Sequence, residues 1–313
     1  MMEHAMLRST FPLLLAAGLW LLQPASLSPA LAGPFLERLQ ARMAAREAES
    51  RIAPAAEYAY GSDPLQRLDF WQARGGTAAP LVVFVHGGGW MRGDKRNATG
   101  AAKVEHLLAQ GYAFASIDYR LVPSASVEQQ AADVAAAVAW LRNNAGRLGI
   151  DPARIVLMGH SAGAHLVALV GTDPRYLAAA GLSLRDVGGI VALDGACYDV
   201  ARQIADSGRF MTDTYIQAFG TDPARQRALS PTLQAAKPNA PAFLILHVDR
   251  ADGTAQSEAL GAALMQAGTP AEVEAVRGTG LRGHIEINRE LGNASHPATA
   301  IVDAWLRRTI GAR

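Results

Sequence analysis

The stretch Ile155-Val-Leu-Met-Gly-His-Ser-Ala-Gly-Ala-His-Leu166 joins an apolar run, a serine between two glycines and a helix-prone segment. This order predicts a buried strand, a sharp turn with Ser161 at its apex, and a helix. Gly159 and Gly163 suit such a turn, because larger side chains there would collide with the neighbouring strand and helix. The hydroxyl would then stand clear of the sheet and could act as a nucleophile. A strand-to-helix turn without chemistry is the alternative.

A glycine run follows the apolar segment 81–85, whose composition is that of a strand buried on both faces. Residues 86–90 read His-Gly-Gly-Gly-Trp. Acyl transfer from a serine develops a negatively charged oxygen, which needs at least two hydrogen-bond donors. We expect these donors to be the backbone N–H groups of Gly88, Gly89 and Ala162. A phosphate cradle fits less well, because no Lys-Ser/Thr pair ends the run and no G-x-G-x-x-G spacing exists.

The remaining chain predicts an α/β fold with a mostly parallel, doubly wound sheet and helices on both faces. Strand-like and helical segments alternate from residue 81 to the end, after two short strands that resemble an antiparallel edge hairpin. Residues 200–240 break the alternation, and we interpret them as a partly helical, lid-like insertion above the sheet. The predicted strands are 57–60, 67–72, 81–85, 112–117, 154–159, 189–193, 242–248 and 271–276; the predicted helices are 101–110, 126–144, 164–170, 256–267 and 298–310.

A serine nucleophile needs a base, and the base needs an acid that orients it. In this architecture the chain order is serine, acid, histidine. His284 follows the last strand on the glycine-rich loop 278–283, which suits a side chain that reaches back across the sheet edge. His296 also satisfies the order, but it directly precedes Pro297 at a helix start, where a structural role is expected.

Three aspartates are candidates for the acid. Asp249 stands at the end of the predicted strand 242–248, and we favour it. Asp252 precedes Gly253 and has the character of a turn residue. Asp194 also ends a strand and is the least favoured. The predicted triad is therefore Ser161, Asp249 and His284.

The N-terminal segment has the pattern of a secretory signal. Residues 11–22 form an apolar run, and Ala30-Leu-Ala32 then places small residues where a signal peptidase cuts. We expect cleavage after Ala32, a periplasmic or secreted protein, and no stable membrane span afterwards; an uncleaved anchor is the alternative. Residues 33–56 would contain an amphipathic helix over 34–50, which either covers a substrate cleft or packs on the surface. The catalytic domain would be 57–313.

Composition excludes several other classes of function. The chain has 29 Lys and Arg against 28 Asp and Glu, so charge gives no reason to propose nucleic acid or an anionic surface as a partner. The single cysteine, Cys197, cannot form an internal disulfide and is expected to be a small buried residue. No cluster of His, Cys and acidic residues has metal-ligand spacing, so we expect no metal site. A serine triad requires no cofactor.

Taken together, residues 86–90 and 159–163 with Asp249 and His284 resemble the α/β-hydrolase superfamily. Within it, the match is to the hormone-sensitive-lipase-like and feruloyl-esterase-like carboxylesterases that share a His-Gly-Gly-Gly oxyanion motif, and it covers roughly 57–313. The resemblance implies an α/β-hydrolase fold and a serine hydrolase that cleaves a small-molecule carboxylic ester.

The chain is also similar to the kynurenine formamidase branch, whose motif is His-Gly-Gly-x-Trp. In that branch the acid lies seven residues before a Gln-Ser pair, which here selects Asp249 before Gln256-Ser257. His284-Ile-Glu286 resembles its histidine motif. The usual His-Gly-x-x-Asp pattern is shortened here to His247-Val-Asp249. Hydrolysis of an aryl formamide is thus one alternative, and a non-catalytic binding module with the hydrolase fold is another.

Overall fold

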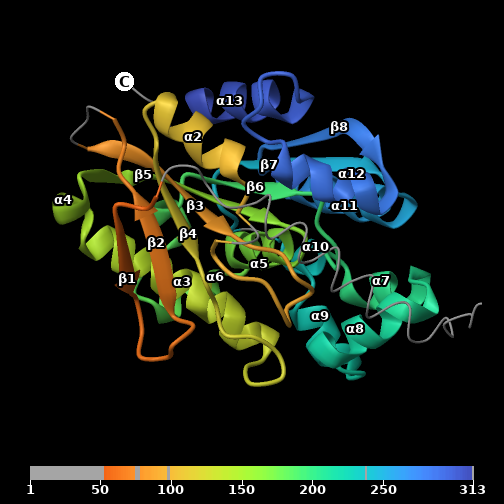
Figure 1. Cartoon of the computed structure of the whole chain (residues 1–313). Helices are drawn as coiled ribbons and strands as arrows, with labels where there is room; N and C mark the ends of the chain where they lie inside the picture. The colour runs from red at the N-terminus through yellow and green to blue at the C-terminus, as the bar shows by residue number, and fades with distance from the viewer. Residues whose placement is uncertain (1–52, 75–77, 97–98, 237, 312–313) are drawn as a thin grey trace, which may run out of the picture. The chain divides into compact units, whose positions relative to one another are not determined.

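The computed structural model describes residues 53–74, 78–96, 99–236 and 238–311 (Figure 1). The predicted signal segment and the predicted helix over 34–50 lie outside the described residues. Contacts divide the chain after Ala41, and every described residue belongs to the second unit. Among the helices of this described part, none is long and apolar enough to cross a membrane.

The described residues form one eight-stranded sheet in the order β1-β2-β4-β3-β5-β6-β7-β8 (Figure 1). β1 and β2 are antiparallel, and β2 pairs antiparallel with β4, whereas all other neighbours are parallel. The predicted edge hairpin and mostly parallel sheet are therefore confirmed. The strands are β1 (Ala56–Ala59), β2 (Arg67–Trp71), β3 (Ala79–Val85), β4 (Ala113–Ile117), β5 (Ile150–His160), β6 (Gly189–Leu193), β7 (Phe243–Asp249) and β8 (Ala271–Thr279).

Helices cover both faces of the sheet, as the alternation predicts. Successive strand residues point to opposite faces, so Val83 and Leu157 belong to one core, while Phe84 and Met158 belong to the other. The first core includes residues of α3 (Val127–Asn143), α5 (Ala162–Thr172) and α11 (Ala251–Gln266). The second includes residues of α2 (Ala101–Ala109), α12 (Gly280–Arg289) and α13 (Pro297–Thr309). Shorter elements are α4 (Ala145–Leu148), α6 (Pro174–Ala179) and η1 (Leu184–Asp186).

Residues 200–240 form four helices, α7 (Val200–Asp206), α8 (Arg209–Phe219), α9 (Pro223–Ala228) and α10 (Pro231–Gln234). Figure 1 shows α7, α8 and α9 grouped together. The Trp90 ring packs edge-on against Phe219, with centroids 4.8 Å apart, and its indole N–H lies 3.3 Å from Nδ1 of His165. Nε2 of His165 in turn donates to the Leu229 carbonyl at 2.8 Å. The glycine segment 86–90 and α5 therefore both contact this helical insertion.

Among the element boundaries that differ from the sequence-based expectation, two affect the candidate site. The segment predicted as a loop over 278–283 is helical from Gly280, so His284 lies inside α12. A Cβ on Gly278 would stand 2.9 Å from Cα of Gly283, which shows how tightly β8 turns into this helix. Glycine is a poor helix former, and here tertiary packing overrides that preference. Likewise, α11 begins at Ala251 rather than at 256, which places Asp252 in its first turn.

Candidate active site

Ser161 occupies the strained turn between β5 and α5, as the sequence predicts. Its φ of 56° and ψ of −119° are unusual for a residue with a side chain. A Cβ on Gly159 would lie 2.2 Å from the Gly163 carbonyl oxygen, and one on Gly163 would lie 2.1 Å from the Val85 carbonyl oxygen. Only glycine fits at these two positions, so the turn that presents Ser161 depends on them.

The glycine segment lies directly beside this serine. A Cβ on Gly87 would be 3.0 Å from the Ser161 Cβ. Gly88 and Gly89 have φ values of 123° and 61°, which turn the backbone in a way that other residues rarely adopt. Within the described part of the chain, the N–H groups of Gly88, Gly89 and Ala162 donate to no protein acceptor. Backbone donors without a protein partner therefore lie in the glycine segment and at the start of α5, the two segments that meet at Ser161.

The imidazole of His284 contacts a different aspartate from the one the sequence favoured. Its Nδ1–H donates to Oδ2 of Asp194 at 2.5 Å. Asp194 directly follows β6, is completely buried, and has a φ of 43°. Donation from Nδ1 leaves Nε2 as the proton acceptor of a neutral imidazole. This is the tautomer that a general base facing a serine needs.

Both oxygens of the Asp194 carboxylate have partners. Oδ1 accepts the Val248 N–H at 3.1 Å, while Oδ2 also lies 3.1 Å from Nε of Arg250. Burial acts to raise the pKa of this carboxyl, but the His284 contact, the Arg250 charge and the Val248 N–H outweigh it and hold the pKa below its usual value. Asp194 is consequently charged at neutral pH.

The structure does not bring Asp249 to His284, so the prediction of Asp249 as the acid that orients His284 is contradicted. Asp249 is exposed, and its carboxylate has no hydrogen bond or ion pair within the described residues. Asp252, the second candidate, contacts Arg250 and Gln203 instead. The physical reason is that α12 directs His284 towards the end of β6, the strand next to that of Ser161. The signal that was available is the apolar run 189–193 ending in Asp194-Gly195.

His160 links the nucleophile turn to the base. Its Nε2–H donates to the His284 carbonyl at 2.8 Å, and the two rings lie 4.6 Å apart. Burial, and then the charge of His284, hold the pKa of His160 well below its usual value, so His160 is neutral. Because His160 immediately precedes Ser161, this contact links the turn that carries Ser161 to α12. The sequence-based interpretation of His160 as a supporting residue agrees with this contact. His296, the other candidate base, occupies the residue before α13, and its side chain makes no capping hydrogen bond there.

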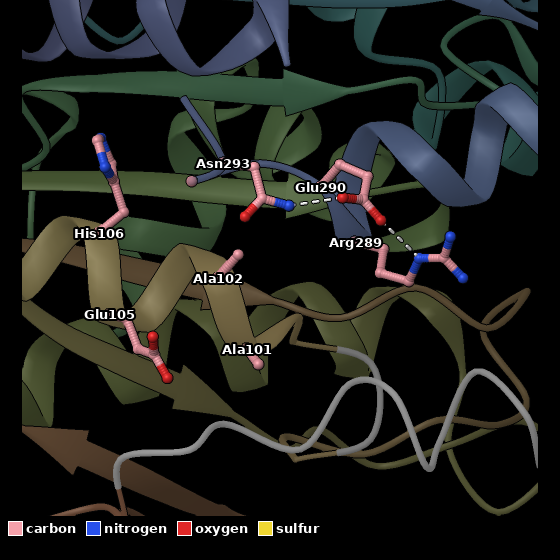
Figure 2. A pocket seen from close by; sticks show the side chains of 8 residues that line it. Ala101, Ala102, Glu105, His106, Arg289, Glu290 and Asn293 are labelled. Carbon is pink, nitrogen blue, oxygen red and sulfur yellow. Dashed lines mark hydrogen bonds and ion pairs between the residues drawn. The ribbon is translucent and has the colours of Figure 1, made fainter. Parts of the chain in front are cut away.

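A surface hollow of about 570 Å³ lies elsewhere, between α2 and the segment that follows α12 (Figure 2). Figure 2 shows Arg289, Glu290 and Asn293 joined by polar contacts on one side and side chains of α2 on the other. None of its lining residues is Ser161, Asp194 or His284. This hollow is therefore separate from the candidate active site.

Comparisons with known proteins agree with this arrangement. The BD-FAE family model matches residues 68–264, from β2 into α11. Esterase LipC of Mycobacterium tuberculosis is 36% identical over 201 residues, which are 61% of this chain and 49% of LipC. Carboxylesterase NlhH of the same species is 38% identical over 96 residues, covering 31% of this chain and 30% of NlhH. The chain thus spans about half the length of LipC and less than a third of NlhH.

Solved structures establish the same fold. Esterase B of Lactobacillus rhamnosis (HN001) superposes with a TM-score of 0.70 at 24% identity, over 90% of this chain and 93% of that one. A truncated carbohydrate esterase from gut microbiota gives 0.69 at 22% identity, over 85% and 100%. Since the family model covers more than half of the sequence, the chain belongs to the BD-FAE family, and it shares the fold of these solved esterases.

Proposed function

We propose that this protein is a serine carboxylic-ester hydrolase whose triad is Ser161, His284 and Asp194. The observation that carries the proposal is the 2.5 Å contact between His284 Nδ1 and a buried Asp194, next to a strained Ser161 turn. Membership of an esterase family and the named esterase relatives support the reaction class.

In this mechanism, the Ser161 hydroxyl attacks the ester carbonyl while Nε2 of His284 takes its proton. Asp194 holds the imidazole in the required tautomer and stabilises the imidazolium that forms. His284 then returns the proton to the leaving alcohol, and an acyl-enzyme remains. A water molecule, deprotonated by His284, attacks this acyl group and releases the carboxylic acid. The protein itself supplies every group, and no cofactor takes part.

The charge that develops on the carbonyl oxygen is met by the N–H groups of Gly88, Gly89 and Ala162. Their donors are preorganised, because the backbone of the glycine segment is packed against Ser161. Loss of one such donor typically lowers kcat by about 10²–10³-fold. This is the role that the sequence predicts for the three residues.

The helical insertion 200–240 supports a role in shaping the substrate cleft. A Cβ on Gly89 would lie 3.4 Å from Cγ2 of Thr214, so α8 approaches the oxyanion segment closely. We infer that α8 provides one wall of the cleft above Ser161, and that its side chains select the acyl or alcohol group.

The direct test is a fluorophosphonate probe together with a panel of nitrophenyl esters of different acyl lengths, feruloyl and acetyl sugar esters, and N-formylkynurenine. Wild-type protein should be labelled at Ser161 and should hydrolyse esters, whereas Ser161→Ala should lose the label and about 10⁵-fold or more in kcat. Turnover of the formamide alone would replace the ester proposal with the arylformamidase alternative. A folded wild type that neither reacts nor turns over any substrate would leave only the non-catalytic binding module.

We also propose that the protein is exported, on the pattern of residues 11–32. Mass spectrometry of the N-terminus after cell fractionation tests it. A mature chain beginning at Gly33 in the periplasm or medium is expected, and an intact Met1 in the cytoplasm would contradict it.

A further inference from the structure

Arg250 places a positive charge on the acid of the proposed triad. Its Nε lies 3.1 Å from Oδ2 of Asp194, the same oxygen that accepts the His284 hydrogen bond. The orientation at Nε does not meet hydrogen-bond geometry, so the contact is an ion pair. Nη2 lies 3.4 Å from the Gly195 carbonyl oxygen, and the side chain is 19% exposed. The guanidinium is thus held against the backbone and carboxylate of the loop that follows β6.

The contact between Arg250 and Asp194 reduces the stabilisation that Asp194 gives to a protonated His284. The carboxylate of a triad stabilises the imidazolium that forms on the base. A cation on the same oxygen cancels some of that negative field, and at these distances the energy is substantial even with strong screening. Arg250 therefore weakens the field that Asp194 exerts on the imidazole, while it helps to keep the buried Asp194 ionised.

A second carboxylate opposes Arg250 from its other side. Nη1 of Arg250 lies 3.3 Å from Oδ2 of Asp252, in the first turn of α11. The same oxygen accepts the side-chain N–H of Gln203 at 3.0 Å, and Gln203 is a buried residue of α7. The contacts therefore run from α7 through Asp252 and Arg250 to Asp194 and His284.

The other titratable groups around these residues are few. His160, on β5, is neutral for the reasons given above. Tyr198, in the loop after β6, is fully buried, and burial together with the Asp194 charge raises its pKa, so it is also neutral. On α12, Arg282 and Glu286 form an ion pair in which Arg282 is 87% exposed. Besides His284, Arg250 is thus the charged side chain in direct contact with Asp194 in the described part of the chain, and Asp252 reaches Asp194 only through Arg250.

We propose that Arg250 is a positioning residue that sets the pH range of the reaction through Asp194, and that Asp252, held by Gln203 of α7, adjusts the strength of that effect. The proposal rests on the proposed function, because it takes Asp194 as the triad acid. Arg250 touches no reacting atom; it acts on the base through the acid.

The test is the dependence of kcat/KM on pH for wild type, Arg250→Met and Asp252→Asn, with the best nitrophenyl ester. Arg250→Met should move the midpoint of the acidic limb up by roughly 0.5 to 1 pH unit, because an uncompensated Asp194 favours protonated His284. Asp252→Asn should move it down by roughly a few tenths of a unit, since the Arg250 charge is then no longer shared. The opposite signs distinguish an electrostatic role from a structural one, which would lower kcat without such shifts.

Two further variants serve as controls. Arg282→Met removes an equal charge from the helix of His284, but an exposed one, and should leave the midpoint within about 0.2 units. Arg250→Lys keeps the charge and should restore most of the wild-type midpoint, and it keeps the test valid if Arg250→Met does not fold. Equal midpoints for wild type, Arg250→Met and Asp252→Asn, or shifts of the same sign, would overturn the inference.

Asp194→Asn separates this inference from the proposal beneath it. If Asp194→Asn is inactive and the midpoints do not respond to Arg250, only the role of Arg250 fails. If Asp194→Asn remains fully active, the triad itself is wrong, and the role of Arg250 falls with it.

Discussion

The ends of β6 and β7 look alike in sequence and differ in structure. Each strand is an apolar run that ends at an aspartate, Asp194 after β6 and Asp249 at the end of β7. Asp194 is completely buried and engages both carboxylate oxygens, whereas Asp249 is exposed. β6 pairs with β5, the strand of Ser161, and β7 lies one strand farther away. The comparison shows that strand-end position alone does not select the acid; the neighbouring helix that carries the base does.

Backbone strain also distinguishes the end of β6 from the end of β7. Five described residues other than glycine have positive φ, and four of them lie just after β3, β5 or β6: Trp90, Ser161, Asp194 and Cys197. No such residue lies at the end of β7. Strained conformations persist where surrounding contacts over-determine them, and they gather at functional sites. Strain therefore supports β6, rather than β7, as the strand that contributes to the site.

The largest expected effect comes from exchanging each acid for its amide. Asp194→Asn should lower kcat by about 10³–10⁴-fold, because the amide cannot hold His284 in the right tautomer or stabilise its cation. Asp249→Asn should change kcat by less than about threefold, since an exposed carboxylate without partners contributes little. Steady-state hydrolysis of a nitrophenyl ester measures both.

Circular dichroism and thermal unfolding of the two variants serve as the control for folding. An inactive but folded Asp249→Asn beside an active Asp194→Asn would reverse the comparison and restore the acid that the sequence favoured.

Two glycines test how tightly the segments after β6 and β7 are packed: Gly195 in the loop after β6, and Gly253 in the first turn of α11, which follows β7. A Cβ on Gly195 would stand 2.1 Å from the hydroxyl oxygen of Tyr198, a fully buried side chain. Gly195→Ala should therefore lower the free energy of unfolding by about 1–3 kcal/mol. A Cβ on Gly253 would meet Nη2 of Arg250 at 2.6 Å, the far end of a flexible side chain. Gly253→Ala should change stability by less than about 1 kcal/mol, aided by the better helix propensity of alanine.

Urea unfolding of both glycine variants gives the two free energies. Equal losses of stability would mean that the loop after β6 is no more constrained than the start of α11, and that the strain argument does not distinguish them.

The last comparison concerns how α12 is held so that His284 reaches β6. Nζ of Lys103 is fully buried, donates to Asn288 Oδ1 at 2.6 Å, and lies 4.0 Å above the Phe84 ring. Burial holds the pKa of this amine well below its usual value. Because the unfolded chain then binds more protons than the folded one, this group makes stability rise as pH increases towards its ordinary pKa.

Lys103→Met should remove that contribution, so wild type should gain stability over the variant by about 1 kcal/mol or more between pH 7 and 9.5. The kcat of Lys103→Met should fall by less than about tenfold, since Lys103 contacts α12 at Asn288, one turn after His284. Denaturant unfolding at several pH values measures how the free energy of unfolding changes with pH. As a control, Arg282→Met removes an exposed cation of α12, and its pH dependence should equal that of wild type. A parallel pH dependence in wild type and Lys103→Met would mean that Lys103 is charged in the folded protein.

The residues that could be recognised along the chain are those that local geometry constrains. Gly159 is required by a backbone contact within its own strand–turn–helix unit, and Gly163 by close contact with the neighbouring strand β3. The Gly-x-Ser-x-Gly spacing around Ser161 can nevertheless be recognised in the sequence. The glycine segment before Trp90 can be recognised in the same way, and chain order narrows the candidate base to His284 or His296. Alternating apolar runs likewise indicate a parallel sheet covered on both faces.

The acid could not be chosen in this way, because a carboxylate is defined by what surrounds it. Asp194 and Asp249 have the same local pattern, and the difference arises from contacts that span the chain: His284 lies 90 residues after Asp194, and Gln203 meets Asp252 across 49. The start of α12 inside a glycine-rich segment is of the same kind, because packing overrides a weak local preference there. Sequence thus determines the turn that carries Ser161, the proposed nucleophile, while the packing of α12 against the end of β6 determines which aspartate contacts His284.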